Sequence, residues 1–211
     1  MALGCAAATQ AHAESWFQFE AGVGVGLTRD GGDNLWVQYA LPHHEQLTSF
    51  NWLVGITGEP IRHLAYHVDF VDLGRVAAQT MAVDDPDYDA KAHIVLHNAQ
   101  TQGLTPFSGS GHTYAIAATL EPNYTWRGIR FGVEGGGMMY RSTWSETISN
   151  RDGTVTNLSH HPTIQFGYVV GASIGYRNFK VAYRYYPIKS KWDPVPGLAT
   201  ATHSVTVNYA F

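Results

Sequence analysis

The sequence of 211 residues has little charge and a single cysteine: only 14% of its residues are charged, and Cys5 is alone. One cysteine can form neither an intrachain disulfide nor a thiolate metal site, because both need a second sulfur. The net charge of -4 excludes the strongly basic surface with which proteins bind nucleic acid. No segment approaches the roughly 18 consecutive apolar residues of a membrane-spanning helix.

Glycine and aromatic residues are plentiful instead, with 22 Gly, 12 Tyr, 9 Phe and 6 Trp. The mean hydropathy is nevertheless only -0.16. This composition is typical of a transmembrane β-barrel, in which each strand is apolar on one face only, so its average hydrophobicity is low. The length suits a single domain.

The segment "HSVTVNYAF" at residues 203–211 shows the pattern that such a barrel requires. Its residues alternate between an apolar set and a polar set, and a period of two marks a strand with two different faces. Seven further segments alternate in the same way, at 16–27, 50–58, 62–74, 111–121, 127–141, 163–176 and 179–186. We therefore predict an all-β fold, an eight-stranded antiparallel up-and-down transmembrane β-barrel.

The connections between these segments alternate in length. Short connections are expected at 58–60, 121–127 and 177–178, and long ones at 28–49, 75–110, 142–161 and 187–200. Short turns at one end and long loops at the other are typical of outer-membrane barrels. Residues 34–41 also alternate; because the strand number should be even, we expect a hairpin within the first long loop rather than a ninth strand.

The first residues resemble a secretion signal. A small apolar stretch leads to Ala11-His12-Ala13, a cleavage pattern of the A-x-A type. We predict a signal peptide at 1–13 and an outer-membrane barrel domain at 14–211.

Two motifs resemble a known family. The terminal Phe211, with Tyr209 and alternating apolar residues before it, resembles the assembly signal of outer-membrane barrels, here Val205, Val207, Tyr209 and Phe211. "HVDFVDLGRV" at 67–76 resembles the third-strand segment of small OmpA-like and OmpX-like barrels. The resemblance implies a monomer in the bacterial outer membrane, with outer-membrane lipid, lipopolysaccharide and the barrel assembly machinery as partners.

Charged residues gather on the face that should line the lumen. An eight-stranded barrel is just wide enough for side chains to fill it, and charges away from water must be paired. We therefore expect a structural ion-pair network that plugs the lumen, formed by Glu20, His67, Asp69, Glu121, Arg130, Glu134, Lys180 and Arg184.

The sequence favours a structural or surface-interaction role of the adhesion or receptor type, with the long loops contacting an extracellular ligand. No catalytic residue, cofactor or metal is predicted. An enzyme acting on envelope lipid is an alternative, because His67 and Asp69 could together supply a general base, although no nucleophile accompanies them. A narrow channel or a carrier for a small solute is another.

Two further groups need a structure to place them. Histidines at 43–44, 93, 97 and 160–161 could suit Zn or Cu, and the acidic run at 84–89 could suit Ca²⁺ but lacks the EF-hand spacing. Aromatic residues near expected strand ends should form the two interfacial belts of a membrane protein: Trp16, Trp126, Tyr140, Trp144, Tyr186, Tyr209 and Phe211.

Overall fold

The computed structural model describes residues 17–29, 42–83, 104–149, 153–160, 164–188 and 201–211. These residues form ten strands: β1 (Gln18–Arg29), β2 (His44–Gln46), β3 (Thr48–Ile61), β4 (Leu64–Val83), β5 (Leu104–Trp126), β6 (Ile129–Ser149), β7 (Val155–His160), β8 (Gln165–Tyr176), β9 (Phe179–Tyr186) and β10 (Ala201–Ala210). Within the described chain there is no helix long and apolar enough to cross a membrane.

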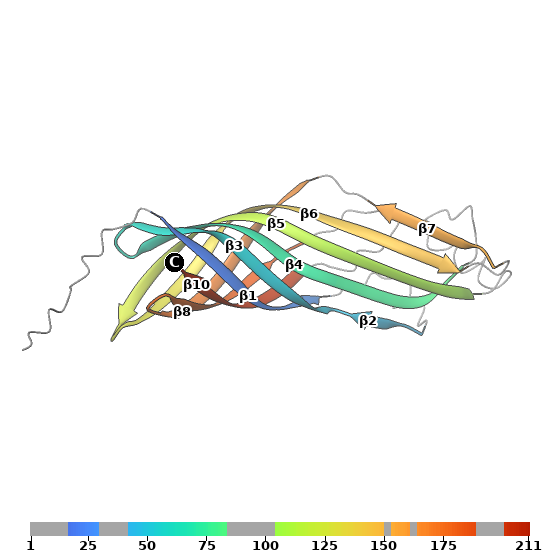
Figure 1. Cartoon of the computed structure of the whole chain (residues 1–211), viewed down its shortest axis with the longest axis horizontal. Helices are drawn as coiled ribbons and strands as arrows, with labels where there is room; N and C mark the ends of the chain where they lie inside the picture. The colour runs from blue at the N-terminus through green and yellow to red at the C-terminus, as the bar shows by residue number, and fades with distance from the viewer. Residues whose placement is uncertain (1–16, 30–41, 84–103, 150–152, 161–163, 189–200) are drawn as a thin grey trace, which may run out of the picture.

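Eight of the strands close into an antiparallel ring (Figure 1). The order around the ring is β1, β3, β4, β5, β6, β8, β9 and β10, and β10 returns to pair with β1 from Glu20↔Ala210 to Arg29↔Ala201. The predicted fold class is confirmed. The two remaining strands lie outside the ring, with β2 paired to β4 and β7 paired to β6.

The ring has one end with tight turns, which we call the turn end. Two-residue turns at 62–63, 127–128 and 177–178 lie there, together with the start of β1 and the end of β10 (Figure 1). The predicted turn at 177–178 is confirmed. The turns predicted at 58–60 and 121–127 are wrong, because the strands continue to Ile61 and Trp126. Pro60 lies in the irregular register between Gly58 and Ile61, where a missing N–H is tolerated.

At the opposite end, three strands continue beyond the ring. β4, β5 and β6 have 20, 23 and 21 residues, whereas the other ring strands have 8 to 14. We call the projecting part the ridge: β2, β7 and residues 75–83, 104–112 and 142–149 (Figure 1). Within the long loops predicted at 75–110 and 142–161, residues 75–83, 104–110, 142–149 and 155–160 are strand instead. The ridge has no continuous apolar face, so alternation of hydrophobicity did not reveal it.

A bulge lies on β4 where the ring passes into the ridge. The register shifts between Asp72 and Arg75, and Gly74 has a φ of 81°. A Cβ on Gly74 would lie 2.3 Å from the carbonyl oxygen of Phe50, so only glycine fits. The Asp-Leu-Gly motif is thus the sequence of a bulge.

The exterior of the ring is apolar on every strand. Large apolar side chains point outward along the alternating positions, and several are far more exposed than any core residue, such as Val133 at 65% and Phe166 at 81%. We call this surface the apolar band. The signal peptide expected at 1–13 and the hairpin expected at 34–41 lie outside the described residues.

Candidate functional site

The eight charged residues predicted for the lumen all lie there, in the half of the barrel next to the turn end. We call them the charged layer: Glu20, His67, Asp69, Glu121, Arg130, Glu134, Lys180 and Arg184. Six of the eight are almost fully buried, and only Arg130 and Lys180 are more exposed. The structure brings them together through ion pairs from strands on opposite sides of the ring.

Arg184 is the centre of the deeper part of this layer. Its guanidinium Nε and Nη2 atoms each lie 2.8 Å from a carboxylate oxygen of Glu134, and its Nη1 lies 2.8 Å from Asp69 Oδ2. Arg184 is only 1% exposed. Such a bidentate geometry is what allows a guanidinium to stay charged away from water.

His67 is the centre of the part nearer the turn end. Its Nδ1 lies 2.7 Å from Glu20 Oε1, and its Nε2 lies 3.1 Å from Glu121 Oε2. Lys180 Nζ lies 3.6 Å from Glu20 Oε2 and 3.5 Å from Glu121 Oε2. Arg130 joins the group through Glu121, at 3.4 Å, and reaches Glu59 at the same distance.

The arrangement around His67 determines what this imidazole can do. Carboxylates only accept hydrogen bonds, so an imidazolium ring donates to Glu20 and Glu121 at once. Such a ring has no free nitrogen with which to accept a proton from a substrate. His67 and Asp69 also have different partners, since Asp69 is held by Arg184. Both side chains are thus held by ion pairs within the charged layer.

A cavity of about 520 Å³ opens between the charged layer and the turn end. We call it the vestibule. Its floor includes His67 and Lys180, and its walls include Arg62, Arg177 and Glu59. Water and small solutes can enter the barrel from the turn end as far as the charged layer.

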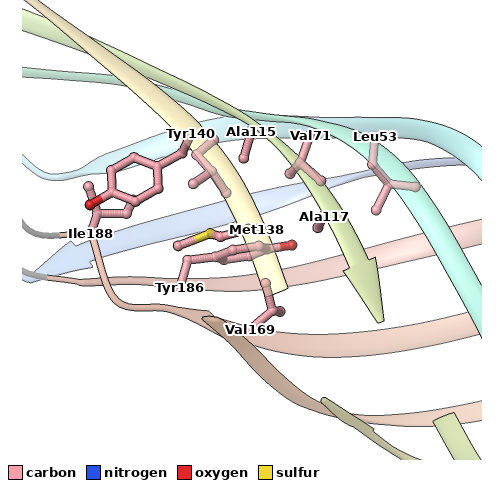
Figure 2. Packing of buried hydrophobic residues seen from close by; sticks show 10 residues of the cluster. Leu53, Val71, Ala115, Ala117, Met138, Tyr140, Val169, Tyr186 and Ile188 are labelled. Atoms are coloured by element: carbon pink, nitrogen blue, oxygen red, sulfur yellow. The ribbon is translucent and has the colours of Figure 1, made fainter. Parts of the chain in front are cut away.

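An apolar cluster lies inside the barrel beyond the charged layer. Figure 2 shows how its side chains pack. Along β4 the successive inward residues are His67, Asp69, Val71 and Leu73, so the two regions follow one another directly. We call the cluster the apolar layer: Leu53, Val71, Leu73, Ala115, Ala117, Met138, Tyr140, Val169, Tyr186 and Ile188. This layer is not among the features predicted from the sequence.

Two aromatic residues of this layer correct a prediction. Tyr140 and Tyr186, expected in the interfacial belts, are 4% and 0% exposed and lie inside the barrel. Both tyrosines lie at even-numbered positions of their strands, as do the lumenal residues of β6 and β9. The alternation of side chains along a strand would therefore have placed them inside the barrel. Trp144 packs in the ridge, whereas Trp126 is exposed on the exterior. Tyr209 and Phe211 are likewise exposed, and Trp16 lies outside the described residues.

The predicted assembly signal lies on the exterior of the closing strand. Val205, Val207 and Tyr209 face outward, while Ser204, Thr206 and Asn208 are buried in the lumen. The backbone N–H of Phe211 donates to the carbonyl oxygen of Phe19 over 2.8 Å, so the end of the chain is paired with β1. Tyr209 packs against Phe179 and Phe211, with ring centroids 4.9 and 5.1 Å away.

A second polar group lies outside the barrel, where the ring meets the ridge. We call it the rim cluster: Asp72, Arg75, His112 and Arg141. His112 Nε2 lies 2.7 Å from Asp72 Oδ1. No local pattern in the sequence predicts this cluster, because its residues come from three strands and two of them lie at the edges of expected loops.

The metal sites considered from sequence find no support. Among the described residues there is no group of three or more His, Cys, Asp or Glu side chains that could hold an ion. Residues 84–89, His93, His97 and His161 lie outside the described part, and the side chain of His160 does as well.

This chain has only limited similarity to known proteins. No protein-family model matches the chain, and no curated protein matches its sequence. Among solved structures, Neisserial surface protein A is 15% identical with a TM-score of 0.45, covering 93% of this chain and 98% of that one. Ail, the attachment invasion locus protein of Yersinia pestis, is 13% identical with a TM-score of 0.44, covering 92% and 97%. The barrel assignment rests on the chain's own strand pairing.

Proposed function

We propose that this protein is an integral barrel of the bacterial outer membrane that supports contacts at the cell surface and does not catalyse a reaction. The observation that carries the proposal is the apolar band. Large apolar side chains cover the outside of all eight ring strands, while the eight residues of the charged layer face the lumen. Lipid is the solvent that suits such an exterior.

The direction of insertion follows from the two ends. Short turns and both chain ends lie on the periplasmic side of barrels of this kind, and longer segments lie outside. The turn end would therefore face the periplasm and the ridge the cell exterior. The ridge then presents five strands to the surroundings, and we propose it, with the connections beyond it, as the contact surface for an extracellular ligand.

The lumen is proposed to be closed. The vestibule ends at the charged layer, and the apolar layer lies directly beyond it. An ion crossing the barrel would have to pass tightly packed apolar side chains without hydration, which is unfavourable. These contacts speak against the channel alternative.

The terminal residues are proposed to act in assembly. Val205, Val207, Tyr209 and Phe211 form an outward apolar row at the strand that closes the ring. A row of this kind is accessible before closure, so the barrel assembly machinery is a suitable partner. A monomer is proposed, because the closed ring leaves no unpaired edge in the membrane.

One observation favours a second candidate, hydrolysis of an envelope lipid. Ser110 lies two residues before His112 on the same outward face, and His112 is bonded to Asp72. In the described part of the chain, however, no hydrogen bond joins Ser110 to His112. The wild type should release fatty acid from outer-membrane lipid only at the background rate, and the variants Ser110→Ala and His112→Ala should release it at the same rate. If the wild type releases fatty acid faster and both variants lose that activity, the protein is an enzyme.

Insertion is tested with the full chain refolded into detergent and into lipid vesicles. The folded barrel should migrate differently from a boiled sample in gel electrophoresis, and it should remain in the vesicles after a wash with alkaline carbonate. Release into the soluble fraction, with no shift on boiling, would overturn the proposed function.

A further inference from the structure

The vestibule is large enough to hold a small organic molecule. Its volume of about 520 Å³ lies within the range of about 300–1,000 Å³ that is usual for ligand pockets. It opens at the turn end and ends at the charged layer, with the apolar layer beyond. A molecule that enters must leave by the same opening, so the vestibule is suited to binding and not to passage.

Positive charge prevails among the residues that line the vestibule, even before His67 is counted. The lining side chains of arginine and lysine outnumber those of glutamate by four to three: Arg62, Arg130, Arg177 and Lys180 against Glu20, Glu59 and Glu121. Each of the three carboxylates already has a cationic partner within this group. The excess of cations favours a ligand that brings a carboxylate of its own.

Two arginines are available to such a carboxylate. Arg62 lies at an exposed turn, and its side chain has no ion-pair partner within the described chain. Arg130 lies 3.4 Å from each of its two carboxylate partners, which is long for a charge-assisted contact, and its Nε is buried without a hydrogen bond. Arg177 is engaged elsewhere, because its guanidinium stacks over the exposed ring of Tyr176 at 5.3 Å.

A buried amide without a partner lies in the wall of the vestibule. Asn208 is 1% exposed, and neither its Nδ2 nor its Oδ1 has a hydrogen bond among the described residues. It pairs with Lys180 across β9 and β10, so it lies at the level of the vestibule floor. A buried amide left in this state is unfavourable, and it needs a partner that both donates and accepts. A peptide group does both.

We infer that the vestibule binds a short peptide with a free carboxyl end. The terminal carboxylate is bound by Arg62 and Arg130, since a guanidinium holds a carboxylate through two parallel hydrogen bonds. A peptide group of the same ligand pairs with the amide of Asn208. This site goes beyond the proposed function, because it needs only the folded ring and no partner at the ridge. In the orientation proposed above, its opening faces the periplasm.

The two parts of the site favour a peptide over simpler ligands. A mineral anion or a small carboxylic acid would satisfy the arginines and leave the amide of Asn208 without a partner. A neutral sugar would satisfy the amide but bring no negative charge to the arginines. A peptide with a free carboxyl end supplies both kinds of group in one molecule.

The test uses the full chain in a non-ionic detergent, after the shift on boiling has shown that it is folded. Isothermal titration calorimetry measures the binding of three probes: trialanine, trialanine with an amidated carboxyl end, and acetate. Trialanine should bind saturably. The amidated form and acetate should bind about tenfold more weakly or worse, because the first lacks the carboxylate and the second lacks the peptide groups.

Two variants assign the contacts to their residues. R62Q/R130Q should bind trialanine about tenfold more weakly or worse, since the site loses both cations. N208L keeps a branched side chain of similar shape but removes the amide, so it should weaken trialanine and leave acetate unchanged. The matched control R127Q removes an exposed arginine that lies at the same end of the ring outside the vestibule lining, and it should stay within about twofold of the wild type.

The inference and the proposed function fail in different ways. No binding of trialanine, equal binding of trialanine and its amide or acetate, or an unchanged affinity of R62Q/R130Q would overturn the inference while the membrane barrel stands. Release of the chain from lipid vesicles, with no shift on boiling, would overturn the proposed function.

Discussion

The charged layer and the apolar layer fill the same lumen by different means. The charged layer holds acids and bases at fixed positions, so each group depends on its partner: removing Arg184 alone would leave two carboxylates buried. The apolar layer depends on the fit of many weak contacts around residues such as Met138 and Tyr186. The two layers should therefore respond differently to mutation: loss of a charge partner should cost somewhat more than loss of volume, and restoring the charge balance should recover stability only in the charged layer.

Arg184→Met should have the largest effect. Asp69 and Glu134 would lose their cation in a nearly dry site, and we expect a loss of about 3–5 kcal/mol in the free energy of unfolding. Urea unfolding in lipid vesicles, followed by tryptophan fluorescence, measures this value. The control R62Q, at the exposed turn of residues 62–63, should lie within about 0.5 kcal/mol of the wild type.

The triple variant D69N/E134Q/R184M sharpens the same point. It removes the buried charges together, so most of the lost stability should return. If the triple variant is as unstable as Arg184→Met, the effect comes from packing and the two layers do not differ in kind.

Met138→Ala should cost about 2–4 kcal/mol, because a cavity would form in the apolar layer. The same unfolding measurement applies, and the change should not depend on salt concentration. Arg130→Gln, whose effect should shrink as salt is added, is the variant for comparison. A salt-dependent loss at Met138 would contradict the assignment of this region to packing.

Gly136→Ala tests the level at which the two layers meet, between Glu134 and Met138 on β6. A Cβ on Gly136 would lie 2.0 Å from the carbonyl oxygen of Ala118, and we expect a loss of about 1–3 kcal/mol. The neighbouring Gly135 faces outward with no atom within 4 Å of a Cβ, so Gly135→Ala is the matched control. Equal stabilities of the two variants would show that the strands are not packed as described.

Arg130→Gln should have the smallest effect. Its side chain is 34% exposed at the vestibule and its ion pairs are 3.4 Å long, so solvent screens them. We expect a change of at most about 1 kcal/mol that shrinks as salt is added. A loss as large as that of Arg184→Met would remove the distinction between the rim of the charged layer and its centre.

The sequence was informative where the membrane imposes a simple pattern. Lipid outside and side chains inside force a period of two, so the alternation at residues such as Val205 and Thr206 revealed the ring strands. The same alternation places the residues of the charged layer on the positions that face the lumen. Their pairing follows from the register of distant strands, which no local pattern specifies: Arg184 and Asp69 are 115 positions apart.

The missed features lie where that pattern fails. The ridge stands outside the apolar band, so Ser108, Ser110 and Ser145 on its strands carry no contrast of hydrophobicity. Tyr140 and Tyr186 were expected in the interfacial belts because they are aromatic, although both occupy strand positions whose side chains face the lumen. The rim cluster combines Arg75 and Arg141 from strands that are not adjacent in the ring, and only the pairing with β5 brings them together.

The central claim is that one face of each ring strand meets lipid and the other meets the lumen. This can be measured on β1, because the only cysteine of the sequence, Cys5, can be replaced by serine and single spin labels then placed at the outward residues 19, 21, 23, 25 and 27. The inward positions are left unlabelled, because even a Cβ on Gly22 or Gly24 would meet Asn208 or the backbone of Val205. Collisions with oxygen, which dissolves in lipid, should be frequent at all five outward positions, and collisions with a water-soluble nickel complex should be rare there but frequent at labels on the exposed turn residues Arg62 and Arg177. Frequent contact of the five outward positions with the nickel complex would contradict the account.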